Sequence, residues 1–300
     1  MQALSKNDAG MVEGGSRLMA TKIKDNFVSK GGKLYLSKEV SHVLIENNVA
    51  KGIVMKNGDV ILSDYVIASS DAHHTMNVLL QGKYSDKYYS DRFNDLQNNP
   101  LQQCLQISYK VSKNMDLYPK MMNFKVNPLK IGPMTFTDIT IRNHAFDKTM
   151  YPNECVLTVL LNVNDEVYDY FKNLDRKQYV LEKNNIGNMI LNEIASYYNI
   201  KEEEISLIDV TTPLTYERYC NAYRGSYMSF LTTKNVKGLM RKGLIKKLKN
   251  FALAGQWLMP PGGLPIALFT GKHAIARICK MDQKPFIELD FKRINKKELA

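Results

Sequence analysis

The stretch FALAGQWLMPPGGLPIALFTG, residues 251–271, decides the fold. An apolar strand, residues 251–254, leads through Gly255 and Gln256 into a turn rich in proline and glycine. A helix is expected after it, over residues 266–280, because proline is favoured in a first helical turn. Such a turn offers free backbone N–H groups and the positive end of the helix dipole. The stretch therefore predicts a strand, a glycine-rich turn and a helix, and the turn suits a phosphate or the pyrimidine carbonyl of a flavin.

Residues 14–71 show a second mixture of helix and strand. Ser16 is expected to cap a helix over residues 17–30, which Gly31 and Gly32 end. Short strands are predicted after it at residues 33–36, 40–46, 50–55, 60–63 and 65–68. Asn57-Gly58 is typical of a tight hairpin. We therefore expect a helix, a β-meander and a buried strand that ends in a loop at residues 69–71.

Residues 72–212 have a different character. Strands are predicted at 101–111, 135–142, 154–162 and 205–210, helices at 74–80, 87–96 and 177–198, and a loop at 119–133. Many strands with few helices indicate an α+β domain with an open sheet. Aromatic and methionine side chains gather here, and they form either ordinary core or the lining of an apolar ligand site. They are Tyr118, Met121, Met122, Phe124, Met134 and Phe136.

The composition limits the classes of protein. The 300 residues carry a net charge of +11, and much of the excess lies in residues 237–249 and 292–297. This charge suits solvated surface, an anionic membrane surface or nucleic acid, but no nucleic-acid-binding motif accompanies it, and we expect no nucleic-acid partner. No apolar run is long enough to span a membrane, and the N-terminus has no signal-peptide core. A cytoplasmic protein, with membrane association as a second possibility, is expected.

Several kinds of chemistry are disfavoured. The four cysteines are far apart, which predicts free thiols, and His73-His74 has no further cysteine or histidine nearby, so we expect no metal site. No two of the 17 glycines are separated by a single residue, so G-x-G-x-x-G is absent from the sequence. The sequence also contains no Walker motif with its lysine, no G-x-S-x-G and no H-E-x-x-H. A self-sufficient hydrolase or nucleotide triphosphatase is therefore poorly supported.

Four stretches, in this order, resemble the C-terminal part of phytoene-desaturase-like flavoprotein oxidoreductases. This group includes carotenoid desaturases, carotenoid isomerases and retinol saturases, and it is related to amine oxidases. The stretches are Gly14-Gly15-Ser16 with Gly31-Gly32, residues 39–68, residues 212–219 with Gly225-Ser226, and residues 253–271. The last stretch, with its l-x-a-G-q-w and P-G-g-G-l-p pattern, is the most specific.

The resemblance implies an α/β fold of the Rossmann-like, glutathione-reductase or amine-oxidase type. It implies a partial FAD-binding domain with an inserted α+β, mixed-sheet substrate domain. The expected segments are 1–71 and 226–285 for FAD, 72–225 for substrate, and 286–300 as a basic tail. Implied FAD contacts are Val40, Ala68, Ser69, Gly255, Gln256, Gly262, Gly263, Leu264, Pro265 and Ala267. No catalytic acid or base is assigned. Arg218 and Tyr219 are the polar candidates nearest a motif, but a structural salt bridge and domain packing are the favoured roles for them.

The implied activity is hydride transfer between flavin N5 and an apolar polyene or lipid. The family's N-terminal strand–G-x-G-x-x-G–helix unit is missing from this sequence. We therefore expect a truncated or split member that binds FAD weakly by itself, with a separate N-terminal half as its partner. Whether the chain is an enzyme stays open at this point. The alternative is a non-catalytic remnant that binds a lipid or a partner protein without flavin.

Overall fold

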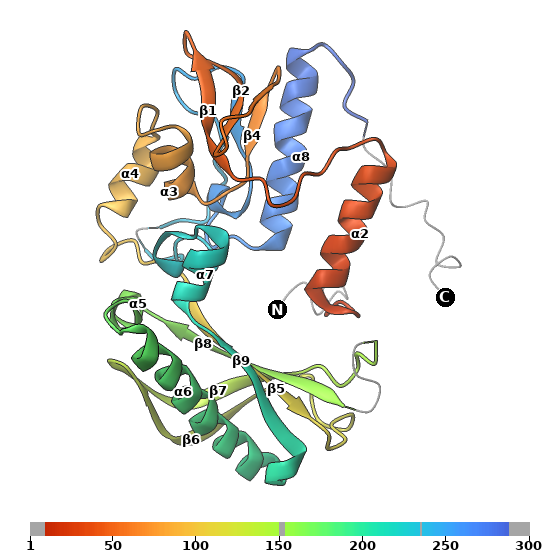
Figure 1. Cartoon of the computed structure of the whole chain (residues 1–300), viewed down its shortest axis with the longest axis vertical. Coiled ribbons are helices and arrows are strands. Elements are labelled where there is room, and N and C mark those ends of the chain that lie inside the picture. Colours follow the sequence, from red (N-terminus) through yellow and green to blue (C-terminus); the bar gives the residue numbers. More distant parts are fainter. Residues whose placement is uncertain (1–9, 150–153, 235, 288–300) are drawn as a thin grey trace. The chain divides into compact units, whose positions relative to one another are not determined.

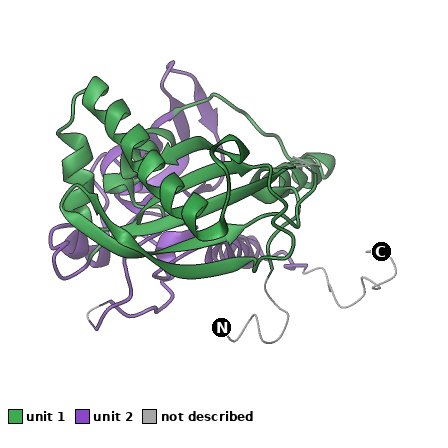
Figure 2. Ribbon diagram, turned by 90° about the horizontal axis from the view of Figure 1, so that it is seen from below, with its two compact units in different colours: residues 1–39, 100–227 green, residues 40–99, 228–300 purple. Residues whose placement is uncertain are grey.

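The computed structural model describes residues 10–149, 154–234 and 236–287 and divides into two compact units (Figures 1 and 2). Unit 1 consists of Met1–Glu39 and Pro100–Tyr227, and unit 2 of Val40–Asn99 and Met228–Ala300. Most of unit 1 is thus inserted between the two segments of unit 2. These limits differ from the predicted domain limits: residues 72–99 belong to unit 2, and residues before Val40 belong to unit 1.

Unit 1 is built on a five-stranded antiparallel sheet with the strand order β6-β7-β8-β5-β9. The strands are β5 (Gln103–Val111), β6 (Met121–Ile131), β7 (Met134–Asn143), β8 (Cys155–Val163) and β9 (Ile205–Thr211). Buried and half-buried residues alternate almost strictly along β5 and β8, because successive side chains of a strand point to opposite faces. One face of the sheet therefore carries the main apolar core.

The helix α6 (Arg176–Tyr198) packs against strands of this sheet (Figure 1). It begins at a capping box in which Asp175 and Gln178 bond each other's backbone N–H groups. Ile186, Ile190 and Ile194 recur every fourth residue and are fully buried, so they form the apolar stripe that faces the core. The other helices of unit 1 are α2 (Gly15–Ser29), α5 (Asp165–Lys172) and α7 (Pro213–Cys220), with single turns at η2 (Glu202–Glu204) and η3 (Tyr223–Gly225).

Unit 2 contains two small sheets. An antiparallel meander joins β1 (Val40–Glu46), β2 (Val49–Met55) and β3 (Val60–Leu62), and β4 (Val66–Ala68) pairs in parallel with β10 (Phe251–Leu253). Asn47 and Asn48 both have positive φ, as a two-residue hairpin turn requires. The helical elements are α3 (Ala72–His74), the π-helical turn η1 (Thr75–Leu79), α4 (Lys87–Phe93), η4 (Gln256–Leu258) and α8 (Leu264–Met281). None of the described helices is long and apolar enough to cross a bilayer.

The structure corrects several local predictions. Residues 119–133 are not a loop, because β6 occupies most of them. The pairing of β6 with β7 is irregular between Lys125 and Leu129, which accommodates Pro128 and hides the strand pattern. Ser16 does not cap α2; Gly14 holds the cap position, without a side-chain bond. Residues 33–36 form no strand. The short helices α5 and α7 were not predicted.

The aromatic and methionine group of the middle segment belongs mainly to the core of unit 1. Phe124 is buried in it, and four others are partly buried and packed against it: Tyr118, Met122, Met134 and Phe136. Met121 is 64% exposed. These positions favour the core interpretation over a ligand lining.

Candidate cofactor site

The predicted cofactor residues come together at one end of the β4–β10 sheet, within unit 2. Leu253 pairs with Ala68, and the next amide, that of Ala254, donates to the carbonyl of Ala68 at 2.9 Å. Both strands therefore end side by side, Ala68 leading into Ser69 and Leu253 into Gly255. Ligands of open parallel sheets bind beyond the carboxyl ends of the strands. Ala68 is buried, whereas Ser69 is exposed at this end.

Gly255 sits where backbone segments approach closely. Its φ is +107°, and a Cβ added there would lie 3.3 Å from the carbonyl oxygen of Ser69. Its amide donates to Oγ1 of Thr270 at 2.8 Å, and Thr270 is only 2% exposed. The hydroxyl of Thr270 in turn lies 2.9 Å from the carbonyl of Ile266. A buried side chain of α8 thus holds the backbone that leaves β10.

The turn before α8 is held by contacts of its own. Gly262 and Gly263 both have positive φ, which glycine adopts without strain. The amide of Gly263 donates to Oε1 of Gln256 at 3.3 Å. The amide of Ser229 donates to the carbonyl of Pro261 at 2.9 Å. Side-chain and backbone contacts therefore fix the path of residues 260–263.

The beginning of α8 offers backbone donors. Gly263 takes the cap position without a side-chain bond, and Pro265 has no N–H. The first internal bond runs from the amide of Ala267 to the carbonyl of Gly263 at 3.0 Å. The amides of Leu264 and Ile266 have no acceptor within the described part of the chain. Together with the dipole, these two donors make the helix start a place for a carbonyl oxygen or an anion.

Nine of the ten predicted contact residues lie at the end of β4 or just after it, in the residues that follow β10, or in the turn before α8 and its first helical turn. Val40 is the exception, because it begins β1 in the other sheet of unit 2. Two residues that sequence reasoning missed support the turn. They are Thr270, which holds Gly255, and Ser229, whose buried Oγ has no hydrogen-bond partner in the described structure. A single hydroxyl in an apolar helix gives no sequence signal for a contact 15 residues away.

Arg218 and Tyr219 lie in α7 of unit 1 and are both exposed. Nothing in their surroundings assigns them a role in chemistry. A half-buried ion-pair cluster of unit 1 is centred instead on Arg224, whose Nε donates to Asp165 at 2.9 Å and whose Nη2 donates to the more exposed Asp169 at 2.7 Å. Paired in this way, Arg224 connects η3 to α5 and has a structural role.

The titratable groups packed near the turn are held neutral. The hydroxyl of Tyr89 donates to the carbonyl of Trp257 at 2.9 Å, and burial raises the pKa of Tyr89 far above its ordinary value. Burial and the neighbouring His74 lower the pKa of His73, whose ring packs edge-on against Phe93. Neither arrangement prepares an acid or base near pH 7. The site is therefore suited to binding and orienting a cofactor that performs the chemistry itself.

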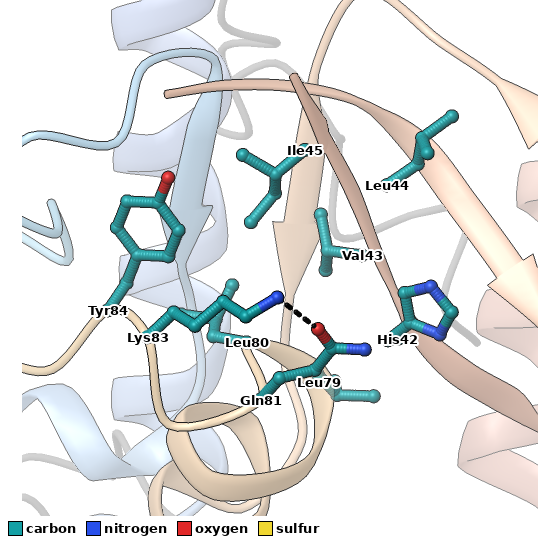
Figure 3. A pocket seen from close by; sticks show the side chains of 9 residues that line it. All are labelled: His42, Val43, Leu44, Ile45, Leu79, Leu80, Gln81, Lys83 and Tyr84. Atoms are coloured by element: carbon teal, nitrogen blue, oxygen red, sulfur yellow. Dashed lines mark hydrogen bonds between the residues drawn. The ribbon is translucent and has the colours of Figure 1, made fainter. Parts of the chain in front are cut away.

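A separate pocket of about 260 Å³ lies beside β1 (Figure 3). Its apolar part comes from β1 and from the end of η1 with the residue after it, including Val43, Ile45 and Leu80. Nζ of Lys83 donates to Oε1 of Gln81 at 3.0 Å within the lining. None of the predicted cofactor residues lines it. It is therefore not part of the candidate cofactor site.

Comparisons with known proteins agree with the resemblance predicted from the sequence. No family model matches the chain. A 4,4'-diapophytoene desaturase (4,4'-diapolycopene-forming) of Methylomonas sp. is 31% identical over 77 residues, which cover 26% of this chain and 15% of the desaturase. Over these 77 residues the chain is similar to a phytoene-desaturase-type protein, which agrees with the resemblance predicted from the sequence.

The fold is similar to part of one solved structure. A crystal structure of an oxidoreductase from Methanosarcina mazei matches with a TM-score of 0.58 and 13% identity, covering 88% of this chain and 55% of that one. The PF1083 protein from Pyrococcus furiosus matches with a TM-score of 0.48 and 12% identity, covering 92% of this chain and 54% of that one. The chain thus spans about half the length of these structures. The first of them confirms the predicted fold class.

Proposed function

We propose that the chain forms part of an FAD-dependent oxidoreductase that acts on an apolar polyene or another lipid. The observation that carries this proposal is the constrained loop at Gly255–Gln256 beside the open N-terminus of α8, joined to Ala68 and Ser69 across the β4–β10 pair. The sequence similarity to a diapophytoene desaturase supports the same reaction class. A bound flavin would supply the hydride chemistry, and the protein would supply position and electrostatics.

The residues present fit a flavin. Gly255, Gly262 and Gly263 carry no side chains, so a ligand can approach the backbone closely at these positions. We assign the amides of Leu264 and Ile266 to the flavin C2 carbonyl, because they are free donors at the positive end of α8. Gly255 and Gln256 would lie along the ribityl-pyrophosphate, and Ala68 and Ser69 beside it. Val40, on its separate sheet, is proposed for the adenine end.

A partner polypeptide completes the proposed site. The exposed face of α8 carries Leu264, Leu268 and Ile275, which are 59%, 65% and 45% exposed and share one stripe of the helix. A Cβ added at Gly271, within this stripe, would meet nothing within 4 Å. The stripe supports packing against a strand–glycine-rich turn–helix unit supplied by a separate polypeptide. Such a unit would hold the FAD pyrophosphate, so this chain by itself is expected to bind FAD weakly.

Two variants of α8 test the proposal by FAD binding. Ala267→Glu places a carboxylate in the first turn of α8. The positive end of the helix dipole tolerates this charge, but the carboxylate would repel the electron-rich carbonyl of the flavin. His273→Glu introduces the same side chain at an exposed position of the same helix. We expect FAD fluorescence titrations to show weak binding to the wild-type chain, at least about tenfold weaker binding to Ala267→Glu, and no change for His273→Glu.

Two outcomes would contradict the proposal. The first is an equal FAD affinity of the two variants, which would remove the N-terminus of α8 from the site. The second is the absence of FAD binding at any accessible concentration. In that case the alternative, a remnant that binds a lipid or a partner without flavin, would account for the chain.

A further inference from the structure

An apolar pocket of about 310 Å³ lies in unit 2 at the opposite end of β4 and β10 from the cofactor loop. It is lined at the beginning of these strands, by Tyr65, Val66 and residues 250–252, and by the second half of α8. The segment of residues 244–250 forms its remaining wall. None of the proposed flavin contacts lines this pocket, so it is a separate site.

The interior of the pocket suits a hydrocarbon chain. Its apolar lining includes Leu244, Leu248, Phe251, Ala252, Ala274 and Ile278. Phe251 and Ala274 are 3% exposed and form a fixed floor, whereas Leu244 and Met281 are 47% and 52% exposed at the opening. Since liquid water occupies about 30 Å³ per molecule, the volume holds roughly ten groups of that size. A chain of about ten carbon atoms therefore fills it.

The rim of the pocket is cationic. Arg277 and Lys249 line it, and Asn250 lies beside them. Arg277 uses one N–H for the carbonyl of Lys242, at 2.8 Å, which holds the side chain in place and leaves other N–H donors for a ligand. Lys249 makes no ion pair within the described residues. The rim thus offers a fixed guanidinium and a mobile ammonium group.

Asp282, a carboxylate bonded to the pocket-lining Tyr65, already has partners. Asp282 accepts a hydrogen bond from the hydroxyl of Tyr65 at 2.5 Å and lies 3.7 Å from Lys284. The C-terminal end of α8 disfavours an anion only weakly, whereas a hydrogen bond from a charged group stabilises an anion more strongly. The cations of the rim therefore outweigh the helix dipole, and the pocket favours a negative headgroup.

We propose that this pocket binds an amphipathic anion, with a single hydrocarbon chain of about ten carbon atoms inside and its anionic head at Arg277 and Lys249. The inference is independent of the flavin proposal. A free fatty acid and an anionic membrane lipid share this chemistry. Lys249, at the end of the basic segment of residues 237–249, gains a binding role in this way.

Decanoate below its micellar concentration is the first probe, and calorimetric titration is the measurement. We expect one decanoate to bind per chain, and decanol, which lacks the charge, to bind at least about tenfold more weakly. Arg277→Gln is expected to weaken decanoate binding by a similar factor without changing the affinity for decanol. Lys280→Gln is the matched control, because Lys280 is an exposed cation of the same helix that does not line the pocket.

Vesicles distinguish the two sources of the ligand. Co-sedimentation compares phosphatidylcholine vesicles with vesicles that also contain phosphatidylglycerol. Anionic-vesicle binding that Arg277→Gln weakens and Lys280→Gln preserves identifies a membrane lipid, whereas decanoate binding without this vesicle effect identifies a free fatty acid. The proposal is overturned if Arg277→Gln and Lys280→Gln are indistinguishable with both probes, or if neither probe binds.

Discussion

The replacement Thr270→Val tests how the cofactor loop is held. Thr270 is 2% exposed, and its Oγ1 accepts the hydrogen bond from the amide of Gly255 at 2.8 Å. Valine keeps the shape of threonine but has no oxygen, so the Gly255 amide is left buried without an acceptor. A buried donor that loses its partner costs about 1–3 kcal/mol. We therefore expect the free energy of unfolding of unit 2 to fall by about 2 kcal/mol.

The control is Thr270→Ser, which keeps the hydroxyl and removes one methyl group. Loss of a buried methyl group costs about 1 kcal/mol, so both variants are expected to be less stable than the wild type. Stability alone therefore does not distinguish a lost hydrogen bond from lost packing. Hydrogen exchange at the Gly255 amide does separate them. We expect this amide to lose protection in the valine variant and to keep it in the serine variant.

The assay for stability uses the protein's single tryptophan. Trp257 is 5% exposed and lies two residues after Gly255, so its fluorescence during urea unfolding reports on unit 2. If Thr270→Val unfolds within about 0.5 kcal/mol of the wild type, or if Gly255 exchanges equally in both variants, the hydrogen bond does not hold the loop. The account of a preformed cofactor loop would then fail.

Three further predictions concern both units. Gly243→Ala places a Cβ 2.3 Å from the carbonyl oxygen of Leu253, so we expect about 3 kcal/mol of destabilisation by tryptophan fluorescence. Gly82→Ala, at a similar φ but in open space, should cost about 1 kcal/mol. Burial raises the pKa of the Cys104 and Cys155 thiols to about 11, so at pH 8 a disulfide reagent should modify the exposed Cys220 first and leave these two unmodified. Burial and the nearby Arg142 lower the pKa of His144. The contribution of neutral His144 to stability is therefore present above about pH 6.5 and is lost as the pH falls through the lowered pKa. Unfolding of His144→Asn, followed by circular dichroism, should therefore be less sensitive to acid than unfolding of the wild type.

The sequence predicted elements well where a local signal and a long-range requirement agree. The meander of β1, β2 and β3 was expected from its short strands and the Asn57-Gly58 turn, and the structure gives β1 the predicted bounds. The helix α8 follows its Pro-Gly turn because that turn and the apolar helix periodicity indicate the same start. The prediction for the residues of β6 was wrong because local signal and long-range pairing disagree there. Pro128 and the lysines around it read as a loop, and only pairing with β7 makes the segment a strand.

The sequence indicated the unusual backbone of the candidate site, but it did not indicate which side chains hold that backbone in place. Glycines and prolines at residues 255–265 mark unusual backbone conformations, which a sequence shows directly. The contacts that fix those conformations come from Thr270, Gln256 and Ser229, and these depend on how α8 returns against β10. Only Gln256 stands inside a recognisable pattern. Side chains that act across a fold therefore escape a reading of local spacing.

The cofactor loop and its surroundings make different contributions to binding. The loop conformations at Gly255 and Gly263 are held by contacts within unit 2, so a ligand would not have to order them, and this lowers the entropic cost of binding. The exposed stripe of α8 at Leu264 and Leu268 shows that apolar contacts next to the loop are still open. In the proposed site, the affinity for FAD would therefore be limited by the number of contacts and not by the cost of forming the loop. A completing polypeptide would raise affinity by adding contacts, and the backbone of residues 255–265 would change little when it binds.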